Sequence, residues 1–124
     1  MARDLLSRRP DSVTFGAFAE DLVGILGVLR STGSKSRHKA SIVGMYVATA
    51  FRRRGIGHRL LIAGIDYAGS LDGVRSINLC VTDAAPSAKA LYERAGFRLW
   101  GVEREALCVD GDFLTEYHMS LALR

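Results

Sequence analysis

The sequence has few of the features that mark secreted, membrane-bound or metal-binding proteins. It contains two cysteines, Cys80 and Cys108, and they form no Cys-x-x-Cys pair. That number and spacing favour buried free thiols over a disulfide or a metal site. No apolar run reaches the length of a membrane span, and the start Met1-Ala2-Arg3-Asp4 lacks the apolar core of a signal peptide. We therefore expect a soluble cytoplasmic protein with no metal and no membrane partner.

The sequence has a moderate excess of positive charge, but its basic residues lack the distribution that is typical of nucleic-acid-binding proteins. Seventeen basic and 13 acidic residues give a net charge of +4, which is enough to attract phosphates. The densest basic cluster is the short run 52–54, and no stripe of basic and aromatic residues occurs elsewhere. We therefore expect no nucleic-acid partner.

The pattern of apolar residues predicts a single domain over residues 1–124. A length of 124 residues with 48% hydrophobic content is enough for one core. A polar loop is predicted at 31–39, and a helix that ends near residue 69 follows the third strand. The predicted strands are 13–19, 22–30, 42–48, 75–82, 97–107 and 113–121. This order gives a mixed sheet with helices packed against it.

The run Arg52-Arg53-Arg54-Gly55-Ile56-Gly57 follows the predicted strand 42–48 and opens a helix. Its alternate glycines let backbone N–H groups turn inward with no Cβ in the way, and a helix N-terminus adds about half a positive charge. Leu60 stands where a P-loop or a dinucleotide fingerprint requires other residues, so neither pattern is met. The run predicts a pyrophosphate site, with a basic surface turn as the structural alternative.

A second motif, AKALYERAGF at residues 88–97, is typical of one short helix. Pro86 suits the first helical turn, and Gly96 suits a left-handed cap at the end. The apolar residues recur at helical spacing, so the Leu91-Tyr92 pair is also compatible with plain core packing.

In order and spacing, the two motifs together resemble those of the GNAT acyltransferase superfamily. The loop of that family reads Arg/Gln-x-x-Gly-x-Gly/Ala, and its later helix reads Asn-x-x-Ala-x-x-Leu-Tyr-x-x-x-Gly-Phe. The resemblance extends over about residues 13–123, and residues 109–119 are similar to the last hairpin of amine and protein N-acetyltransferases. It implies an α+β fold, layered α/β/α, whose mixed and mostly antiparallel sheet has about six strands and a splayed central parallel pair.

The resemblance also implies a reaction and a cofactor site. The reaction is direct transfer of an acetyl group from acetyl-CoA to a primary amine, in a small molecule or at a protein N-terminus. Tyr92 is implied as the general acid that protonates the leaving thiolate, and N–H groups near Val47 as donors to the thioester carbonyl. No metal takes part. The implied acetyl-CoA-binding residues are Met45, Tyr46, Val47, Arg52, Arg53, Arg54, Gly55, Ile56, Gly57 and His58.

Two positions in the implied site depart from the family pattern. Ala85 replaces an asparagine that helps to hold the cofactor, and Cys80 stands where some members carry a glutamate general base. Glu116 and His118, which alternate on the last predicted strand, or a water relay are the alternatives for the base. A nucleophilic pair of Cys80 and His118 is conceivable, although the spacing gives it no support. These departures keep a second function open, that of a catalytically silent acyl-CoA-binding module.

The N-terminal segment is short for the family, which places a strand and two helices before the hairpin predicted at 13–30. Residues 1–12 leave room for at most one short helix, at 4–9. In that arrangement the strand 13–19 lies at the sheet edge and exposes Val13, Phe15 and Phe18. We therefore expect a homodimer that buries this hairpin or the sheet face beside it.

Overall fold

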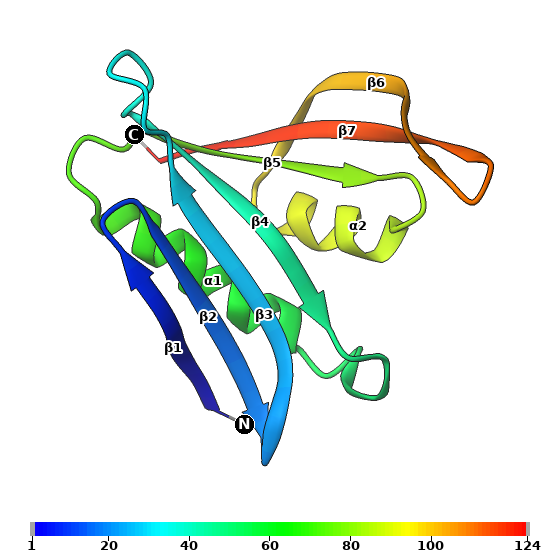
Figure 1. The fold of residues 1–124 in the computed structure, drawn as a ribbon, viewed down its shortest axis with the longest axis horizontal. Coiled ribbons are helices and arrows are strands. Elements are labelled where there is room, and N and C mark those ends of the chain that lie inside the picture. Colours follow the sequence, from blue (N-terminus) through cyan, green and yellow to red (C-terminus); the bar gives the residue numbers. More distant parts are fainter. Residues whose placement is uncertain (1, 124) are drawn as a thin grey trace.

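The computed structural model describes the backbone of residues 2–123 and the side chains of residues 9–123. Seven strands form one mixed sheet in the order β1-β2-β3-β4-β5-β7-β6 (Figure 1). The strands are β1 (Ala2–Arg9), β2 (Ser12–Ala19), β3 (Asp21–Arg30), β4 (Lys39–Val47), β5 (Ser76–Thr82), β6 (Arg98–Val109) and β7 (Asp112–Ala122). The helices are the 3-10 turn η1 (Thr49–Phe51), α1 (Ile56–Ser70) and α2 (Pro86–Arg94). The predicted mixed α+β architecture is confirmed, with one strand more than expected.

The N-terminal segment forms a strand, so the prediction of a short helix at 4–9 is wrong. β1 pairs antiparallel with β2 across a tight turn, with Arg9 opposite Ser12 and Ala2 opposite Phe18. A helix of six residues is marginal by itself, because its nucleation cost is spread over few hydrogen bonds. As a strand the same segment pairs with β2 along its whole length, which satisfies the backbone groups that face β2.

The position of β1 makes β2 an inner strand, which also corrects the expectation of an exposed apolar edge. Val13 is only 1% exposed and belongs to the core. Phe15 packs edge-on against Tyr67 of α1, with ring centroids 6.1 Å apart. Phe18 is partly buried. Residues predicted to lie on an open edge therefore pack within the fold.

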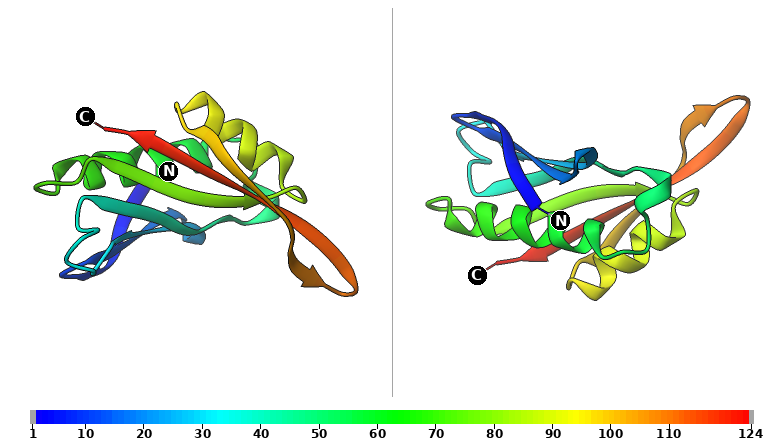
Figure 2. Two further views of the ribbon diagram at one scale, coloured as in Figure 1. Left: turned by 90° about the horizontal axis from the view of Figure 1, so that it is seen from above. Right: turned by 90° about the horizontal axis from the view of Figure 1, so that it is seen from below.

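Both α-helices lie on the same side of the sheet (Figure 2), so the described residues form two layers rather than the α/β/α layers that the resemblance implies. α1 packs on β2, β3 and β4, and α2 packs on β5. Gly64 allows the close approach of α1, because a Cβ at this position would lie 2.7 Å from Cδ2 of Leu26. Leu60 and Leu61 of the same helix face are fully buried. Neither helix within residues 2–123 is long and apolar enough to cross a membrane.

The central strands β4 and β5 run parallel but pair only near their beginnings. The paired residues extend from Lys39 and Ser76 to Ser41 and Asn78. Beyond this point the two strands diverge, as Figure 1 shows. The splayed parallel pair expected from the sequence is therefore present, and it opens the middle of the sheet.

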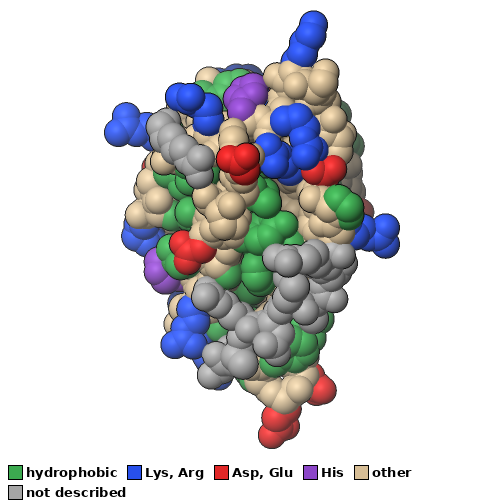
Figure 3. All heavy atoms as spheres, turned by 90° about the vertical axis from the view of Figure 1, so that its left-hand side faces the viewer, with side chains coloured by type: hydrophobic (Ala, Val, Ile, Leu, Met, Phe, Trp, Pro, Cys, Tyr) green, Lys and Arg blue, Asp and Glu red, His purple; other side chains and the backbone are tan. Residues whose placement is uncertain are grey.

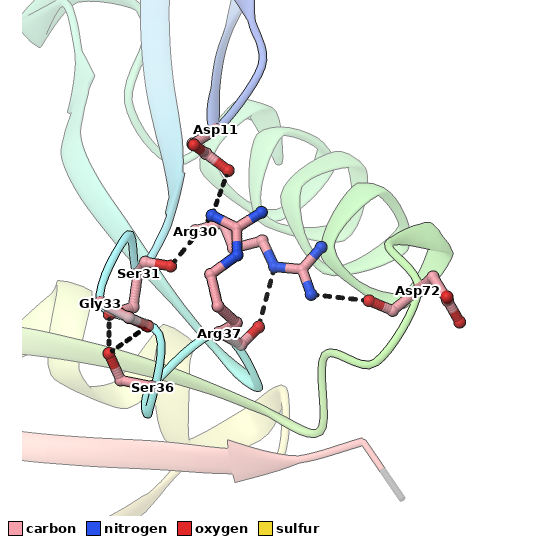
Figure 4. Close-up of polar contacts among 7 residues, drawn as sticks. All are labelled: Asp11, Arg30, Ser31, Gly33, Ser36, Arg37 and Asp72. Atoms are coloured by element: carbon pink, nitrogen blue, oxygen red, sulfur yellow. Dashed lines mark hydrogen bonds and ion pairs between the residues drawn. The ribbon is translucent and has the colours of Figure 1, made fainter.

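A polar network fixes the end of the sheet where β4 and β5 are paired (Figure 4). Arg37 in the loop after β3 forms a 2.5 Å ion pair with Asp11. Arg30 donates one hydrogen bond to the carbonyl oxygen of Arg37, at 2.8 Å, and another to that of Asp72, at 2.7 Å. The network thus ties the β1–β2 turn, the loop after β3 and the loop after α1 to one another, while the opposite end of β4 and β5 stays apart.

Candidate functional site

A cleft of about 540 Å³ opens where β4 and β5 separate. Its volume lies in the range of about 300–1,000 Å³ that is usual for small-molecule sites. The walls come from β4, β5, α2, β6 and β7, and they include Met45, Cys80, Tyr92, Trp100 and His118. The splay therefore brings together residues that are distant in the chain.

A bulge at Gly44 shapes the β4 wall of the cleft. Gly44 has a φ of +60°, and together with Met45 it stands opposite one residue of β3, because the pairing shifts between Ile25 and Gly27. A bulge of this kind interrupts the ladder and turns the strand more strongly. Of the predicted cofactor residues, Met45 belongs to the bulge, and Tyr46 and Val47 follow it in the part of β4 that does not pair with β5.

Arg52 closes the end of β4. Its Nε donates a 2.9 Å hydrogen bond to the carbonyl oxygen of Val47, and its guanidinium lies over the ring of Tyr46, 5.5 Å from the centroid. The side chain of Arg52 therefore holds the loop 52–55, which leads into α1, against the strand that lines the cleft.

The loop after η1 has the backbone conformation that an inward-turned run of amides requires. Arg53 and Gly55 have φ angles of +65° and +78°, and Gly55 is the N-cap of α1. The first hydrogen bond of α1 runs from the N–H of Arg59 to the carbonyl of Gly55, at 3.1 Å. The N–H groups of Ile56, Gly57 and His58 precede it and have no partner within the helix, so they offer an anion site at its positive end.

Gly57 has a packing role that the sequence interpretation did not include. A Cβ at Gly57 would lie 3.0 Å from Cε of Met45 and 3.2 Å from Cδ2 of Leu91. The glycine therefore lets the first turn of α1 approach β4 and α2, which places the anion site beside the cleft.

The helix that carries Tyr92 has well-defined ends. It begins with Pro86 in its first turn, and Gly96 follows it with a φ of +104°, as predicted. The N–H of Gly96 bonds the carbonyl of Glu93, and the N–H of Phe97 bonds that of Tyr92, both at 3.0 Å. This is a Schellman motif, and its usual apolar contact is the edge-on pair of Tyr92 and Phe97, with centroids 6.0 Å apart. The motif fixes the ring of Tyr92.

The phenol of Tyr92 is buried but reaches the cleft. The residue is 6% exposed, and its hydroxyl donates to Sδ of Met45 at 3.5 Å. Burial raises the pKa of Tyr92 above its ordinary value. The phenol is therefore held in the protonated form that a general acid needs.

Cys80, His118 and Glu103 form a hydrogen-bonded array on the opposite wall. Sγ of Cys80 lies 3.1 Å from Nδ1 of His118, and Nε2 of His118 lies 3.3 Å from Oε1 of Glu103. Burial raises the pKa of the Cys80 thiol, and the carboxylates of Glu116 and Glu103 raise it further. The sequence spacing gave no support to a Cys80–His118 contact, yet the two residues are direct partners in the β5–β7 ladder.

The prediction that both cysteines are buried thiols is wrong. Cys80 and Cys108 are free and exposed. Cys80 faces the open cleft because β4 has moved away from β5, whereas Cys108 lies in the long β6–β7 hairpin that extends beyond the helices.

Two residues at the site were absent from the sequence-based predictions: Trp100, which lines the cleft, and Glu103, which contacts His118. Trp100 is 65% exposed and its ring lies 5.3 Å from that of His118. Glu103 bonds the same imidazole. Both lie on β6, whose register with β7 shifts between Leu99 and Gly101 and again after Glu103. These irregularities leave no periodic signal that predicts which β6 side chains face the site.

Several solved structures have a similar fold, and some of them are named as acetyltransferases. The acetyltransferase of GNAT family from Streptococcus pneumoniae has a TM-score of 0.84 at 23% identity, over 90% of this chain and 67% of that one. Ribosomal-protein-alanine N-acetyltransferase from Brucella melitensis has a TM-score of 0.80 at 23% identity, over 90% and 68%. Arabidopsis thaliana NAA60 in complex with acetyl-CoA has a TM-score of 0.79 at 19% identity, over 92% and 77%. At these identities the similarity concerns the fold.

The sequence itself matches one protein family. The comparison with curated proteins gives no match. The model of the acetyltransferase (GNAT) family matches residues 2–97, which is most of the chain. The chain therefore belongs to the acetyltransferase (GNAT) family.

Proposed function

We propose that the protein is an N-acetyltransferase that moves an acetyl group from acetyl-CoA directly to a primary amine, in a small molecule or at a protein N-terminus. The observation that carries this proposal is the position of the Tyr92 hydroxyl, buried in the wall of the cleft and 3.5 Å from Met45. Leu91, its neighbour on α2, contacts the first turn of α1 near Gly57, so the anion site adjoins the same cleft. A pure binding site has no need of a phenol there.

Acetyl-CoA is proposed to lie along the open edge of β4. Its pyrophosphate would bind the free N–H groups at the start of α1 together with the arginines 52–54, and its pantetheine arm would pair with backbone groups of Met45 and Tyr46. The carbonyl of Val47 already accepts from Arg52, at 2.9 Å. The N–H of Val47 is the proposed donor to the thioester carbonyl.

The proposed chemistry needs no covalent enzyme intermediate. The neutral amine attacks the thioester carbon, the C–S bond breaks, and the phenol of Tyr92 gives its proton to the departing thiolate. The attacking nitrogen, which becomes positively charged, releases one proton as the amide forms, and this proton restores the phenol directly or through water. The substrate ammonium must first lose a proton. The two bases offered by the sequence, Glu116 and His118, lie with Cys80 in one cluster, and His118 lines the cleft. They are the proposed acceptors of that proton, directly or through water.

A silent acyl-CoA-binding module is the second candidate, and two observations favour it. Ala85 is the N-cap of α2 and makes no side-chain cap, so the polar contact of the family asparagine is missing. Cys80 replaces a carboxylate at the position of a family base. An acceptor screen that follows free thiol release from acetyl-CoA separates the two functions. Thiol release that depends on an added amine supports the enzyme, whereas binding of acetyl-CoA with no release by any amine supports the module.

A homodimer in the cytoplasm remains part of the proposal, with a changed interface. The hairpin predicted at 13–30 does not form the sheet edge, because β1 pairs with β2 outside it, so the sheet face beside this hairpin is the proposed contact. Leu22 and Leu29 of β3 are 48% and 45% exposed. Hydrophobic side chains also show in the middle of the face on the β1 side (Figure 3). Light scattering at tens of micromolar tests the dimer, and a stable monomer would contradict it.

A further inference from the structure

Three side chains with different donor atoms converge beside the cleft. Sγ of Cys80, a ring nitrogen of His118 and a carboxylate oxygen of Glu116 all lie within 4.8 Å of one another. Cys80 is paired directly with His118 across the β5–β7 ladder, and Glu116 precedes His118 by two residues on the same strand face. Two adjacent, hydrogen-bonded strands therefore hold the three donors in place.

The spacing of these donors suits a small cation with few ligands. Zn–S and Zn–N bonds of about 2.3 and 2.0 Å at a tetrahedral angle place the sulfur and nitrogen atoms about 3.5 Å apart. Sγ of Cys80 and Nδ1 of His118 are 3.1 Å apart. A small side-chain rotation is enough to reach the binding geometry, and the longer side chain of Glu116 has more freedom to adjust.

A fourth residue prepares the imidazole for this role. Oε1 of Glu103 lies 3.3 Å from Nε2 of His118. When Nε2 of His118 carries the ring proton and donates it to Glu103, Nδ1 is unprotonated and faces Cys80. This is the tautomer in which Nδ1 can bind a metal. Metal-binding histidines in proteins almost always donate their second ring N–H to such an outer partner, commonly a carboxylate.

We propose that Cys80, Glu116 and His118 form a binding site for a borderline divalent cation such as Zn²⁺, with Glu103 as the residue that orients His118. A set of sulfur, nitrogen and oxygen donors is typical of zinc, whereas Mg²⁺ and Ca²⁺ prefer oxygen donors alone. Three protein ligands leave a position open toward the cleft, which His118 lines. The sequence indicated no metal site because these donors come together only through strand pairing.

Cobalt(II) is the probe that tests this site, because a cobalt–thiolate bond has a charge-transfer absorption in the near ultraviolet. Titration of the reduced protein with Co²⁺ is expected to produce this absorption, and Zn²⁺ is expected to abolish it by displacement. The Cys80→Ser variant should lose the band, and Cys108→Ser should keep it, since both cysteines are exposed and free. No band in the wild type, or an equal band in Cys80→Ser, would overturn the proposal.

Two further variants separate ligation from structural support. Glu103→Gln is expected to weaken Co²⁺ binding by about 10- to 100-fold, the usual effect of losing an outer partner of a ligating histidine. Glu116→Gln should weaken it at least as much. The Glu103→Gln variant should keep the melting temperature of the metal-free protein, because the side chain of Glu103 is 58% exposed. Unchanged cobalt affinity in both variants would contradict the assigned ligand set.

One consequence of the site rests on the proposed function. A cation between Cys80 and His118 occupies the wall of the cleft where the acceptor amine would lose its proton, so Zn²⁺ is expected to inhibit acetyl transfer. If no transfer is found with any amine, the proposed function fails while the cobalt spectrum still decides the cation site. The two proposals therefore fail separately.

Discussion

The hydroxyl of Tyr92 lies 3.5 Å from Sδ of Met45, although 47 residues separate the two in the chain. The contact joins α2 to β4 at the cleft, next to the strand edge that is proposed to bind the pantetheine arm. The Schellman motif fixes the backbone of Tyr92, and the Phe97 ring packs against its side chain. The phenol is therefore held with its hydroxyl toward Met45.

Replacement of Tyr92 by phenylalanine keeps the ring and removes the proton. If Tyr92 is the general acid, turnover should fall by about a hundredfold or more, because general acid catalysis contributes about 10²–10⁴ in rate. Acetyl-CoA affinity should change little, since the ring still packs on Phe97. Steady-state kinetics and a binding titration check the two expectations.

Tyr117→Phe is the matched control for this substitution. Tyr117 lies on β7 with the ammonium of Lys89 over its ring at 5.1 Å, a contact that phenylalanine also makes. Turnover of this variant should be near that of the wild type. Equal turnover in Tyr92→Phe and Tyr117→Phe, at a pH where chemistry limits the rate, would rule out the acid role.

The loop arginines should govern cofactor affinity. Arg53→Gly removes a charge and suits the left-handed backbone at φ +65°, and Arg54→Gln removes a second charge. Together they should weaken binding of coenzyme A by about tenfold or more, since hydrogen bonds to charged groups contribute about 1.5–3 kcal/mol each. The readout is the rise in melting temperature with coenzyme A, because a ligand that binds only the native state stabilises it.

Arg104→Gln controls for the general loss of positive charge, because Arg104 lies on exposed β6 away from the loop. The rise in melting temperature that coenzyme A causes in this variant should match that of the wild type at the same salt concentration. If coenzyme A raises the melting temperature of the Arg53→Gly, Arg54→Gln double variant as much as that of the wild type, the loop does not belong to the cofactor site.

The raised pKa of Tyr92 predicts a loss of stability in alkali. Above about pH 10 the unfolded chain releases the phenol proton while the folded chain still holds it, so the folded state binds more protons. Stability should therefore fall by about 1.4 kcal/mol per pH unit between the unfolded and the folded pKa, and it is unaffected by this group below the unfolded pKa. Urea unfolding at pH 9–11 should show a smaller loss for Tyr92→Phe, and identical profiles would contradict the burial of the phenol.

Gly57 should be required for packing in the absence of any ligand. Gly57→Val places side-chain atoms against Met45 and Leu91, so we expect a loss of about 1–3 kcal/mol in the free energy of unfolding. At Gly69 of the same helix an added Cβ meets nothing within 4 Å, so Gly69→Val should change stability by less than about 0.5 kcal/mol. Equal stability of the two variants in urea would show that α1 does not approach β4 closely.

Local signals in the sequence predicted much of the fold. Pro86 begins α2 and Gly96 follows its end, where the sequence indicated. Asp110 and Gly111 form the last turn, and Gly96, Asp110 and Gly111 all have the positive φ that these positions require. The strand at residues 2–9 was missed because its pairing with β2 depends on partners that a helix-length argument does not consider.

The composition of the site was harder to predict, because it depends on register between distant strands. Cys80 and His118 are 38 residues apart, and they meet because β5 pairs with β7 rather than with β6, the next strand along the chain. Glu103 reaches the same imidazole through irregular pairing of β6. The position of Tyr92, in contrast, follows from a single helix with clear ends, so its place in the cleft was predictable from the family motif.

The most direct test of the account is the identity of the acetylated product. Protein incubated with isotopically labelled acetyl-CoA and a mixture of primary amines and short peptides is analysed by mass spectrometry, while free thiol is measured in the same samples. We expect one labelled acetyl group on an amine for each thiol released, in the wild type and in Tyr117→Phe, with the rate reduced about a hundredfold or more in Tyr92→Phe. Acetyl-CoA that binds the protein but labels no amine above the protein-free control would contradict it.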